Sequence, residues 1–219
     1  MRKLESNKKQ KKEALLNTAF ELFTSKGIHK TSISDIVNSA GVAKGTFYLY
    51  FKDKYDIRNY LISKKAEQIF LAAHNALDRN AIPEIEDQII FIIDHILDQL
   101  SSNPVLLTFI SKNLSWGVFK KALIGSSGQD TSFTLQADSA KNEENPDDDS
   151  FNFYTVYQTL IQNSNRTFSD PEIMLFMMIE LVSATCYSSI LYNEPVTIDK
   201  LKPHLYTQIR HIVEDHEVE

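Results

Sequence analysis

Apolar residues return three and four positions apart along most of this 219-residue chain, and that period limits the fold to helices. The alternating pattern typical of strands never persists over more than a few residues. The chain also has only 6 glycines and 6 prolines, which is few for a fold built on many tight turns. The sequence therefore predicts an all-α protein. The expected helices span residues 11–26, 32–40, 43–50, 54–79, 84–101, 104–124, 151–164, 171–192 and 198–215.

Residues that begin and end helices separate the first four segments. Gly27 lies where the first helix would end in a left-handed C-terminal cap. Ser32 and Asp35, three positions apart, form a capping-box pair at the start of the second helix, and Gly41 stops that helix. Asp53 is a suitable N-cap for the long fourth helix. Three helices, two of them short, therefore precede a long one.

The second and third predicted helices are joined by a tight turn at Gly41, as in a helix-turn-helix. A helix that enters the major groove needs small or polar residues at its exposed N-terminal end and apolar residues against its own domain. The segment 43–50 meets both needs, because Phe47 would anchor it to the domain. The residues at its exposed tip would be Lys44, Gly45 and Thr46, and those reaching outward would be Tyr48, Leu49 and Tyr50.

Charge is distributed unevenly along the chain. Residues 1–65 hold 14 Lys and Arg against 6 Asp and Glu, whereas residues 66–219 hold 9 against 23. A basic N-terminal part can be drawn to a polyanion while the acidic remainder is repelled from it, although a solvated lysine-rich leader has the same composition. Ser32 and Ser34 offer hydroxyl and backbone N–H groups to a phosphate. Lysines that would add non-specific attraction to a DNA backbone are Lys8, Lys9, Lys11, Lys12, Lys52 and Lys54.

Residues 27–54 carry the run GIHKTSISDIVNSAGVAKGTFYLYFKDK, which resembles the N-terminal signature of the TetR/AcrR family of regulators. The resemblance is detailed over roughly residues 10–60, and beyond them it is only a similar succession of helices. It implies that Ser32 and Ser34 contact the DNA backbone and that Lys54 contacts phosphate. By the same resemblance, the residues that face DNA in the recognition helix are Lys44, Gly45, Thr46, Tyr48 and Tyr50.

At three positions of this segment, the roles that the resemblance implies are less certain. Ala43 stands where Ser or another capping residue is common, so a base or phosphate contact at that position is in doubt. Tyr48 and Tyr50 have packing within the small domain as their alternative role, because aromatic rings often anchor such domains.

The resemblance also implies a two-domain architecture. Residues 1–53 would form a three-helix helix-turn-helix DNA-binding domain, and residues 54–219 a helical ligand-binding and dimerisation domain. Family members dimerise as a four-helix bundle through their last two helices, here 171–192 and 198–215, and hold a small molecule between the long helices. Binding there shifts the fourth helix, and Lys52-Asp53 is the only break between that helix and the recognition helix. The DNA-binding domain would therefore move with it.

Candidate effector-binding residues are polar or aromatic positions within apolar helices, and each has a satisfied core residue as its alternative. An aromatic-rich pocket would suit an apolar or planar ligand. Residues 125–150 are rich in Gly, Ser, Asn and Asp and predict a mobile acidic loop, with a lid, a partner site or a disordered insertion as its possible roles. The candidates are His95, Asn113, Trp116, Tyr154, Tyr157 and Tyr187.

Enzyme and metal chemistry find little support in the sequence. Cys186, the single cysteine, lies in an apolar helix, where a buried structural thiol is the default, and it excludes an intramolecular disulfide. GSSG at residues 125–128 lacks the strand-turn-helix context of a nucleophile elbow. His204, His211 and His216 lack zinc-ligand spacing. We therefore predict no enzymatic activity, no cofactor and no metal.

Residues 173–192 are nearly long enough to span a bilayer, but Glu180 and several hydroxyl residues interrupt them, so we expect a helix buried on several sides. The charged N-terminus lacks the apolar run of a signal peptide, which favours a cytoplasmic protein with no membrane partner. The combined prediction is a dimeric repressor that binds a palindromic operator in double-stranded DNA and is released by a small effector. The rival is a helical adaptor, which would lack the strong salt dependence of duplex binding.

Overall fold

The computed structural model describes residues 2–111 and 153–218, and within these ranges it contains helices and no strand. The predicted all-α class is therefore confirmed for the described chain. A single antiparallel bridge between Phe168 and Glu217 joins the segment before α9 to the end of α10. The helices are α1 (Arg2–Ser25), α2 (Ile33–Ser39), α3 (Lys44–Tyr48), α4 (Lys54–Leu77), α5 (Ile85–Ser101), α6 (Pro104–Ser111), α8 (Phe153–Asn163), α9 (Pro171–Tyr192) and α10 (Ile198–His216).

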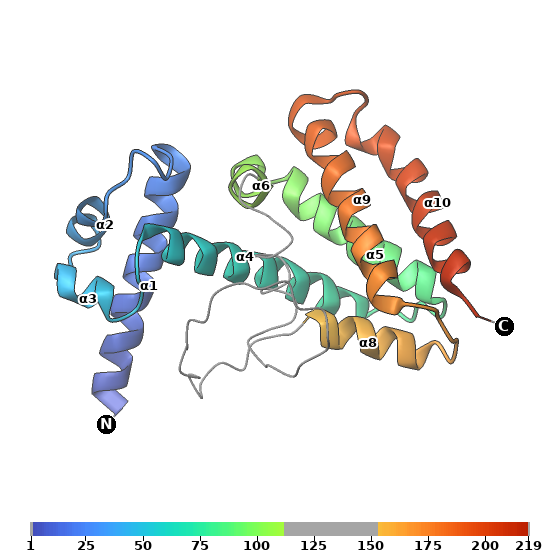
Figure 1. The fold of residues 1–219 in the computed structure, drawn as a ribbon, viewed down its shortest axis with the longest axis horizontal. Coiled ribbons are helices and arrows are strands. Elements are labelled where there is room, and N and C mark those ends of the chain that lie inside the picture. The colour runs from blue at the N-terminus through green and yellow to red at the C-terminus, as the bar shows by residue number, and fades with distance from the viewer. Residues whose placement is uncertain (1, 112–152, 219) are drawn as a thin grey trace.

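Helices α1, α2 and α3 gather at one end of the molecule, and α4 runs from them into the larger group formed by α5, α6, α8, α9 and α10 (Figure 1). Helix α4 packs along α5, while α9 and α10 lie side by side. We call α1–α3 the head and α5–α10 the body. Helix α4 links the two.

Within the described residues, three predicted helices differ from the structure by two residues or more at one end. Helix α1 begins at Arg2 rather than at residue 11, α3 ends at Tyr48 rather than at residue 50, and α4 ends at Leu77 rather than at residue 79. The first error has a physical reason: residues 2–10 carry no apolar stripe, but their Lys, Gln and Glu residues are good helix formers. Residues 112–124 of the expected sixth helix and the acidic segment 125–150 lie outside the described residues.

The capping predictions at α2 and α4 are confirmed. The Ser32 hydroxyl accepts a hydrogen bond from the Asp35 N–H at 3.1 Å, and the Asp35 carboxylate accepts one from the Ser32 N–H at 2.8 Å. Asp53 caps α4 by accepting from the backbone N–H groups of Tyr55 and Asp56. Gly27 adopts φ 83° at the end of α1, a conformation that an L-residue with a side chain rarely takes. These contacts fix the turns between the short helices.

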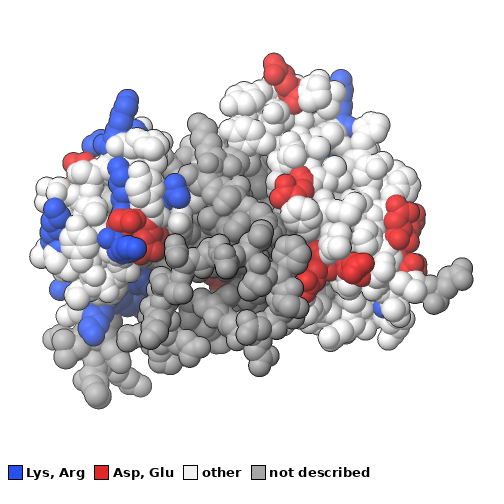
Figure 2. Space-filling model, viewed as in Figure 1, with Lys and Arg blue, Asp and Glu red and all other residues white. Residues whose placement is uncertain are grey.

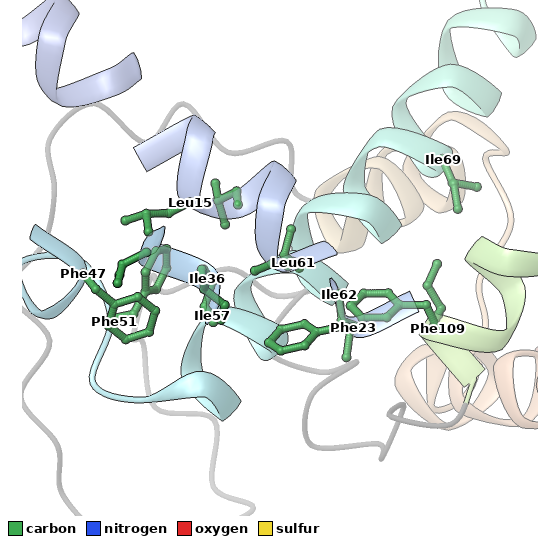
Figure 3. Packing of buried hydrophobic residues seen from close by; sticks show 14 residues of the cluster. Leu15, Phe23, Ile36, Phe47, Phe51, Ile57, Leu61, Ile62, Ile69 and Phe109 are labelled. Carbon is green, nitrogen blue, oxygen red and sulfur yellow. The ribbon is translucent and has the colours of Figure 1, made fainter. Parts of the chain in front are cut away.

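One hydrophobic cluster joins the head to α4 and α6 (Figure 3). Leu15 of α1, Ile36 of α2 and Phe47 of α3 are fully buried in it, together with Ile57 of α4. Phe109 of α6 belongs to the same cluster. The first half of α4 shares this core with the head, so the cluster extends across the predicted domain boundary between residues 53 and 54. That boundary remains a prediction.

Ion pairs hold α10 against α5 in the body. Lys202 lies 2.6 Å from the Asp94 carboxylate, Tyr206 donates a hydrogen bond to Asp94, and Arg210 pairs with Asp87. Burial by itself would raise the pKa of Asp94, but the hydrogen bonds from Lys202 and Tyr206 outweigh it and hold that pKa below the ordinary value. The basic face of α10 is thus matched to the acidic face of α5.

Helix α9 carries apolar residues on every side, interrupted by Glu180 and several hydroxyl residues, and only part of its surface is buried. Met174, Leu175 and Cys186 are buried against the body, whereas Phe176 and Met177 are exposed. By length and composition α9 could also cross a membrane, which is weak evidence, because a core helix of a globular domain passes the same test. Its contacts with α10, α5 and α6 make it a wall of the body.

Candidate nucleic-acid interface and apolar cavity

The exposed side of α3 is built on a buried aromatic anchor. Phe47 is fully buried and makes an edge-to-face contact with Tyr48, with ring centroids 5.5 Å apart. Tyr48 and Leu49 are 54% and 78% exposed, so they project away from the head. A Cβ added at Gly45 would meet nothing within 4 Å, so the surface of α3 is open there. The helix therefore presents a small convex tip that a groove can receive.

The polar residues expected at this tip lie together on the surface. Lys44 and Gly45 are exposed and Thr46 is half-buried in the first turn of α3. Ala43 occupies the N-cap position and makes no side-chain capping bond, because its methyl group has no hydrogen-bond acceptor. The backbone N–H of Thr46 donates to the Ala43 carbonyl at 2.8 Å, so the start of α3 is held by a backbone hydrogen bond and not by a side-chain cap.

Tyr50 lies just beyond α3 and makes a contact that its sequence position did not indicate. Its hydroxyl donates a hydrogen bond to the backbone carbonyl of Lys8 in α1, at 3.1 Å. The side chain is half-buried, so only part of its ring faces solvent. The structure thus gives Tyr50 a bracing role between α1 and the end of α3, and its contact with DNA stays a prediction.

Lys54 also has a role within the protein. Its ammonium group donates hydrogen bonds to the carbonyls of Ile28 at 2.9 Å and Thr31 at 3.0 Å, in the turn between α1 and α2. These bonds tie the first turn of α4 to the segment that leads into α2. Lys54 therefore positions the turn between α1 and α2. Its contact with a DNA phosphate remains a prediction.

Ser32 and Ser34 are both exposed at the start of α2. The Ser32 hydroxyl and backbone N–H are engaged with Asp35 in the capping box, and these hydrogen bonds, the backbone one first, lower the pKa of Asp35. Ser32 therefore stabilises the helix start. Ser34 lies in the first turn, where its hydroxyl is accessible to a DNA backbone.

On the face shown in Figure 2, basic side chains gather over the head, whereas more acidic than basic side chains are visible on the described part of the body. Lys8, Lys9 and Lys11 are exposed along α1. Lys12 is used within the protein, since its ammonium group donates to the Tyr60 hydroxyl at 3.1 Å and lies 4.3 Å from the centre of that ring. The N-terminal turns of α1 therefore extend the positive surface beyond α3.

The body contains a cavity of about 350 Å³ between α4, α5, α6, α8 and α9. Tyr157 and Tyr187, two of the candidate effector-binding residues, line it. Tyr157 is buried, and its hydroxyl donates a hydrogen bond to the Pro171 carbonyl at 2.7 Å. Burial raises the pKa of this phenol, so it stays a neutral donor.

The other candidates lie elsewhere. The Tyr154 hydroxyl donates to the Glu172 carboxylate at 2.8 Å on the surface of the body. His95 stacks on Phe91, with ring centroids 6.3 Å apart, and is not part of the cavity wall. Asn113 and Trp116 lie outside the described residues.

Most of the cavity wall consists of residues that sequence reasoning did not select. Ile92 and Ile96 of α5, Leu107 and Ile110 of α6, and Met178 of α9 all line it. An isoleucine that lines a cavity has the same helical spacing as one that fills a core. No sequence signal separates the two, because the difference lies in how the helices are held apart.

Helix α6 contacts both the cavity and the head. Leu107 and Ile110 line the cavity, and Phe109, one position away, makes an edge-to-face contact with Phe20 of α1 at 5.1 Å. Lys65 of α4 lies 5.1 Å from the same Phe20 ring. The head is therefore connected to the cavity through α6 as well as through α4.

Comparison with known proteins places the N-terminal segment in a described group. A model of bacterial regulatory proteins of the tetR family matches residues 15–61, which contain α2, α3 and the start of α4. The uncharacterized HTH-type transcriptional regulator YvdT of Bacillus subtilis (strain 168) is 51% identical over 59 residues, or 27% of this chain and 28% of YvdT. The HTH-type transcriptional repressor BepR of Brucella suis biovar 1 is 28% identical over 97 residues, or 43% of this chain and 46% of BepR. The chain thus spans less than half the length of either relative.

Solved structures extend the likeness to the whole fold. A tetR-family transcription regulator from Shewanella sp. PV-4 superposes with a TM-score of 0.61 at 20% identity, covering 95% of this chain and 99% of that one. The regulator FadR from Bacillus subtilis, solved in complex with stearoyl-CoA, gives a TM-score of 0.55 at 16% identity, covering 90% of this chain and 96% of that one. At these identities the likeness is one of architecture.

Proposed function

Because this chain belongs to the TetR family of bacterial regulatory proteins, we propose that it is a cytoplasmic, homodimeric transcriptional repressor that an effector in the body cavity releases from a palindromic operator. The observation that carries the proposal is the exposed tip of α3, held on the buried Phe47 anchor within a basic head. Regulators of this family are not enzymes, and we assign no reaction to the chain.

The DNA contacts that we propose fall into two groups. Lys44, Gly45 and Thr46, with the exposed ring of Tyr48, enter the major groove and read base edges. Ser32, Ser34, Lys54 and part of Tyr50, together with the exposed lysines of α1, contact the sugar-phosphate backbone and fix the register. This division is supported by position, because the first group lies on α3, whereas the second lies on α1, at the start of α2 and of α4, and just beyond α3.

Dimerisation is supported by the uncovered side of α9. Ile173, Phe176 and Met177 are large apolar residues exposed on one side of this helix, and Tyr192 is exposed at its end. Such a surface is costly to leave in water, and a second copy related by two-fold symmetry would cover it. The two α3 helices would then reach successive major grooves if the dimer holds them about 34–36 Å apart.

Release by an effector is supported by the position of the cavity. Helices α4 and α6 both line the cavity and both contact the head. FadR was solved with stearoyl-CoA, so this architecture accommodates a small-molecule ligand. A coupling free energy of about 1–3 kcal/mol between the two sites would change operator occupancy roughly 5- to 150-fold.

A salt series with matched variants tests the DNA-binding function. Affinity for a cognate duplex should fall steeply with salt concentration, since bound phosphates release counterions. Lys44→Ala should alter sequence preference, whereas Lys52→Ala, at an exposed position outside α3, should weaken binding about equally for all duplexes. Duplex binding that is indifferent to salt and to both variants would contradict the proposal and favour a protein-binding adaptor.

A further inference from the structure

Leu49 is the most exposed large apolar residue in the part of the chain that the structure describes, at 78% of its surface. It directly follows α3, and its φ of -74° and ψ of -21° continue the helical conformation. A leucine this exposed adds little to the stability of the head, because hydrophobic stabilisation grows with the apolar area that folding removes from water. Contact with a binding partner would put this apolar area to use.

Gly45 lies on the same side of α3, four positions before Leu49. Its backbone lies outside the left-handed region that favours glycine, and an added Cβ would meet nothing within 4 Å. Nothing within the head therefore requires a glycine at this position, although glycine weakens a helix compared with alanine. A helical side chain leans toward the N-terminus of its helix, so Leu49 borders the open space that Gly45 leaves.

The side of α3 that carries these two residues has little capacity for hydrogen bonding. Tyr48, three positions after Gly45, is on the same side and is 54% exposed. Of the three, only Tyr48 has a side chain with a hydrogen-bonding group. This surface is therefore suited to recognising a base by its shape and by an apolar contact. In the major groove thymine alone presents a methyl group, which apolar side chains contact.

We propose that Gly45 and Leu49 read one thymine in each half-site of the operator. The C5-methyl group of that thymine enters the open space beside Gly45 and packs against the Leu49 side chain. The inference rests on the proposed DNA-binding function and adds to it a contact that determines specificity. A cytosine at this position would present a polar amino group to the leucine and leave that group without a protein partner.

A uracil scan of the operator tests this contact, because deoxyuridine has the hydrogen-bonding groups of thymidine and lacks only the methyl group. The operator is the duplex that the full-length protein selects from a random pool, and each thymine of the half-site is replaced in turn. Uracil at one position should weaken binding about threefold to fivefold per half-site, the value of one buried methyl group. Substitution in both half-sites should multiply the two losses.

Leu49→Ala removes the apolar side chain that the methyl group contacts. This variant should bind the thymine and uracil duplexes with equal affinity at the sensitive position. Leu49→Met, which keeps an apolar side chain of similar size, should retain the loss on uracil. Leu71→Ala makes the same truncation at an exposed leucine late in α4, outside the head, and should discriminate between the two duplexes as the wild type does.

Gly45→Ala fills the open space without disturbing the head. Because alanine is the better helix former, the melting temperature should stay the same or rise. Affinity for the thymine duplex should nevertheless fall, and the ratio between the thymine and uracil duplexes should approach one. If Gly45 served only the fold of the head, the melting temperature would fall and the ratio would stay as in the wild type.

Equal wild-type affinity for all the uracil-substituted duplexes would overturn the proposed contact, as would a selected half-site without thymine. A loss on uracil that persists unchanged in Leu49→Ala would assign the methyl contact to another residue. In each of these cases the protein still binds a selected duplex, so the proposed DNA-binding function stands. Failure of that function has a different sign, which is that no duplex is selected even at low salt, and the thymine contact falls with it.

Discussion

Phe47, Tyr50 and Lys54 show how single side chains in the head combine structure with recognition. Phe47 is buried and holds α3, and its inward direction could be predicted from the sequence because it is the apolar anchor of a short segment. The contacts of the other two could not. Tyr50 reaches the Lys8 carbonyl and Lys54 reaches the Ile28 carbonyl, both across large sequence separations. Such contacts depend on how helices meet in space, which a local pattern does not encode.

Lys54→Ala should lower the free energy of unfolding by about 1–3 kcal/mol, because the turn carbonyls lose a charged donor. It should also weaken binding to every duplex by a similar factor. Lys52→Ala is the matched control, since Lys52 is exposed and its removal should weaken DNA binding without a change in stability. Urea denaturation and gel shifts on both variants give the comparison. Equal stability of the two variants would argue against the positioning role of Lys54.

At the scale of helices, ion pairs between oppositely charged side chains hold α10 against α5. The helical spans of both elements could be predicted from their apolar stripes, and in each the structure moves one end by a single residue. Their ion pairs could not be predicted, because spacing within one helix says nothing about which acidic residue of α5 faces Lys202. The same limit applies to the cavity, whose aliphatic wall is indistinguishable in sequence from a filled core.

Acid should weaken the α5–α10 contact. The pKa of Asp94 is lower in the folded protein than its ordinary value of 3.8. Its contribution to stability is therefore complete above that value and is lost as pH falls through the lower folded-state pKa. Asp94→Asn should remove up to about 1 kcal/mol of stability at neutral pH, a figure reduced for solvent screening, and should flatten the loss below pH 4. Thermal unfolding between pH 3 and pH 7 checks this. An unchanged pH profile in the variant would rule out this role for Asp94.

Helix α6 should carry part of the coupling between cavity and head. Phe109→Leu removes the aromatic contact with Phe20 while keeping an apolar side chain in the cluster. We expect the variant to bind DNA and ligand separately, but the ligand should change its DNA affinity severalfold less than in the wild type. Val105→Ala, at an exposed position on the same helix, is the control. DNA titrations with and without ligand measure the ratio, and a ratio equal to wild type would leave α4 as the sole route.

At the scale of the whole molecule, a basic head is joined to an acidic body through α4, and the body leaves an apolar side of α9 uncovered. The charge asymmetry is visible in the sequence alone. The uncovered side is not, because α9 is apolar all round and only its packing shows which side the body occupies. In the dimer that we propose, the first feature would orient the protein toward DNA and the second would set the distance between two heads.

Replacing an exposed apolar residue of α9 should break the dimer. Met177→Lys places a charge in the surface that a second copy would cover, so we expect a monomer with sharply reduced operator affinity. Leu71→Lys adds the same charge at an exposed apolar position of α4 and should leave the dimer intact. Sedimentation velocity distinguishes the two states. A Met177→Lys protein that sediments as a dimer would place the interface elsewhere.

Two copies of the α3 tip should enter major grooves of one duplex together. Selection of bound duplexes from a random pool by the purified full-length protein is the decisive experiment. The selected duplexes should share a palindrome whose half-sites are centred one helical turn apart, about 10–10.5 base pairs, or a multiple of that distance. Substitution at Lys44 or Tyr48 should change the bases selected. Recovery of unrelated sequences with no two-fold repeat, or of no duplex at low salt, would contradict this mode of binding.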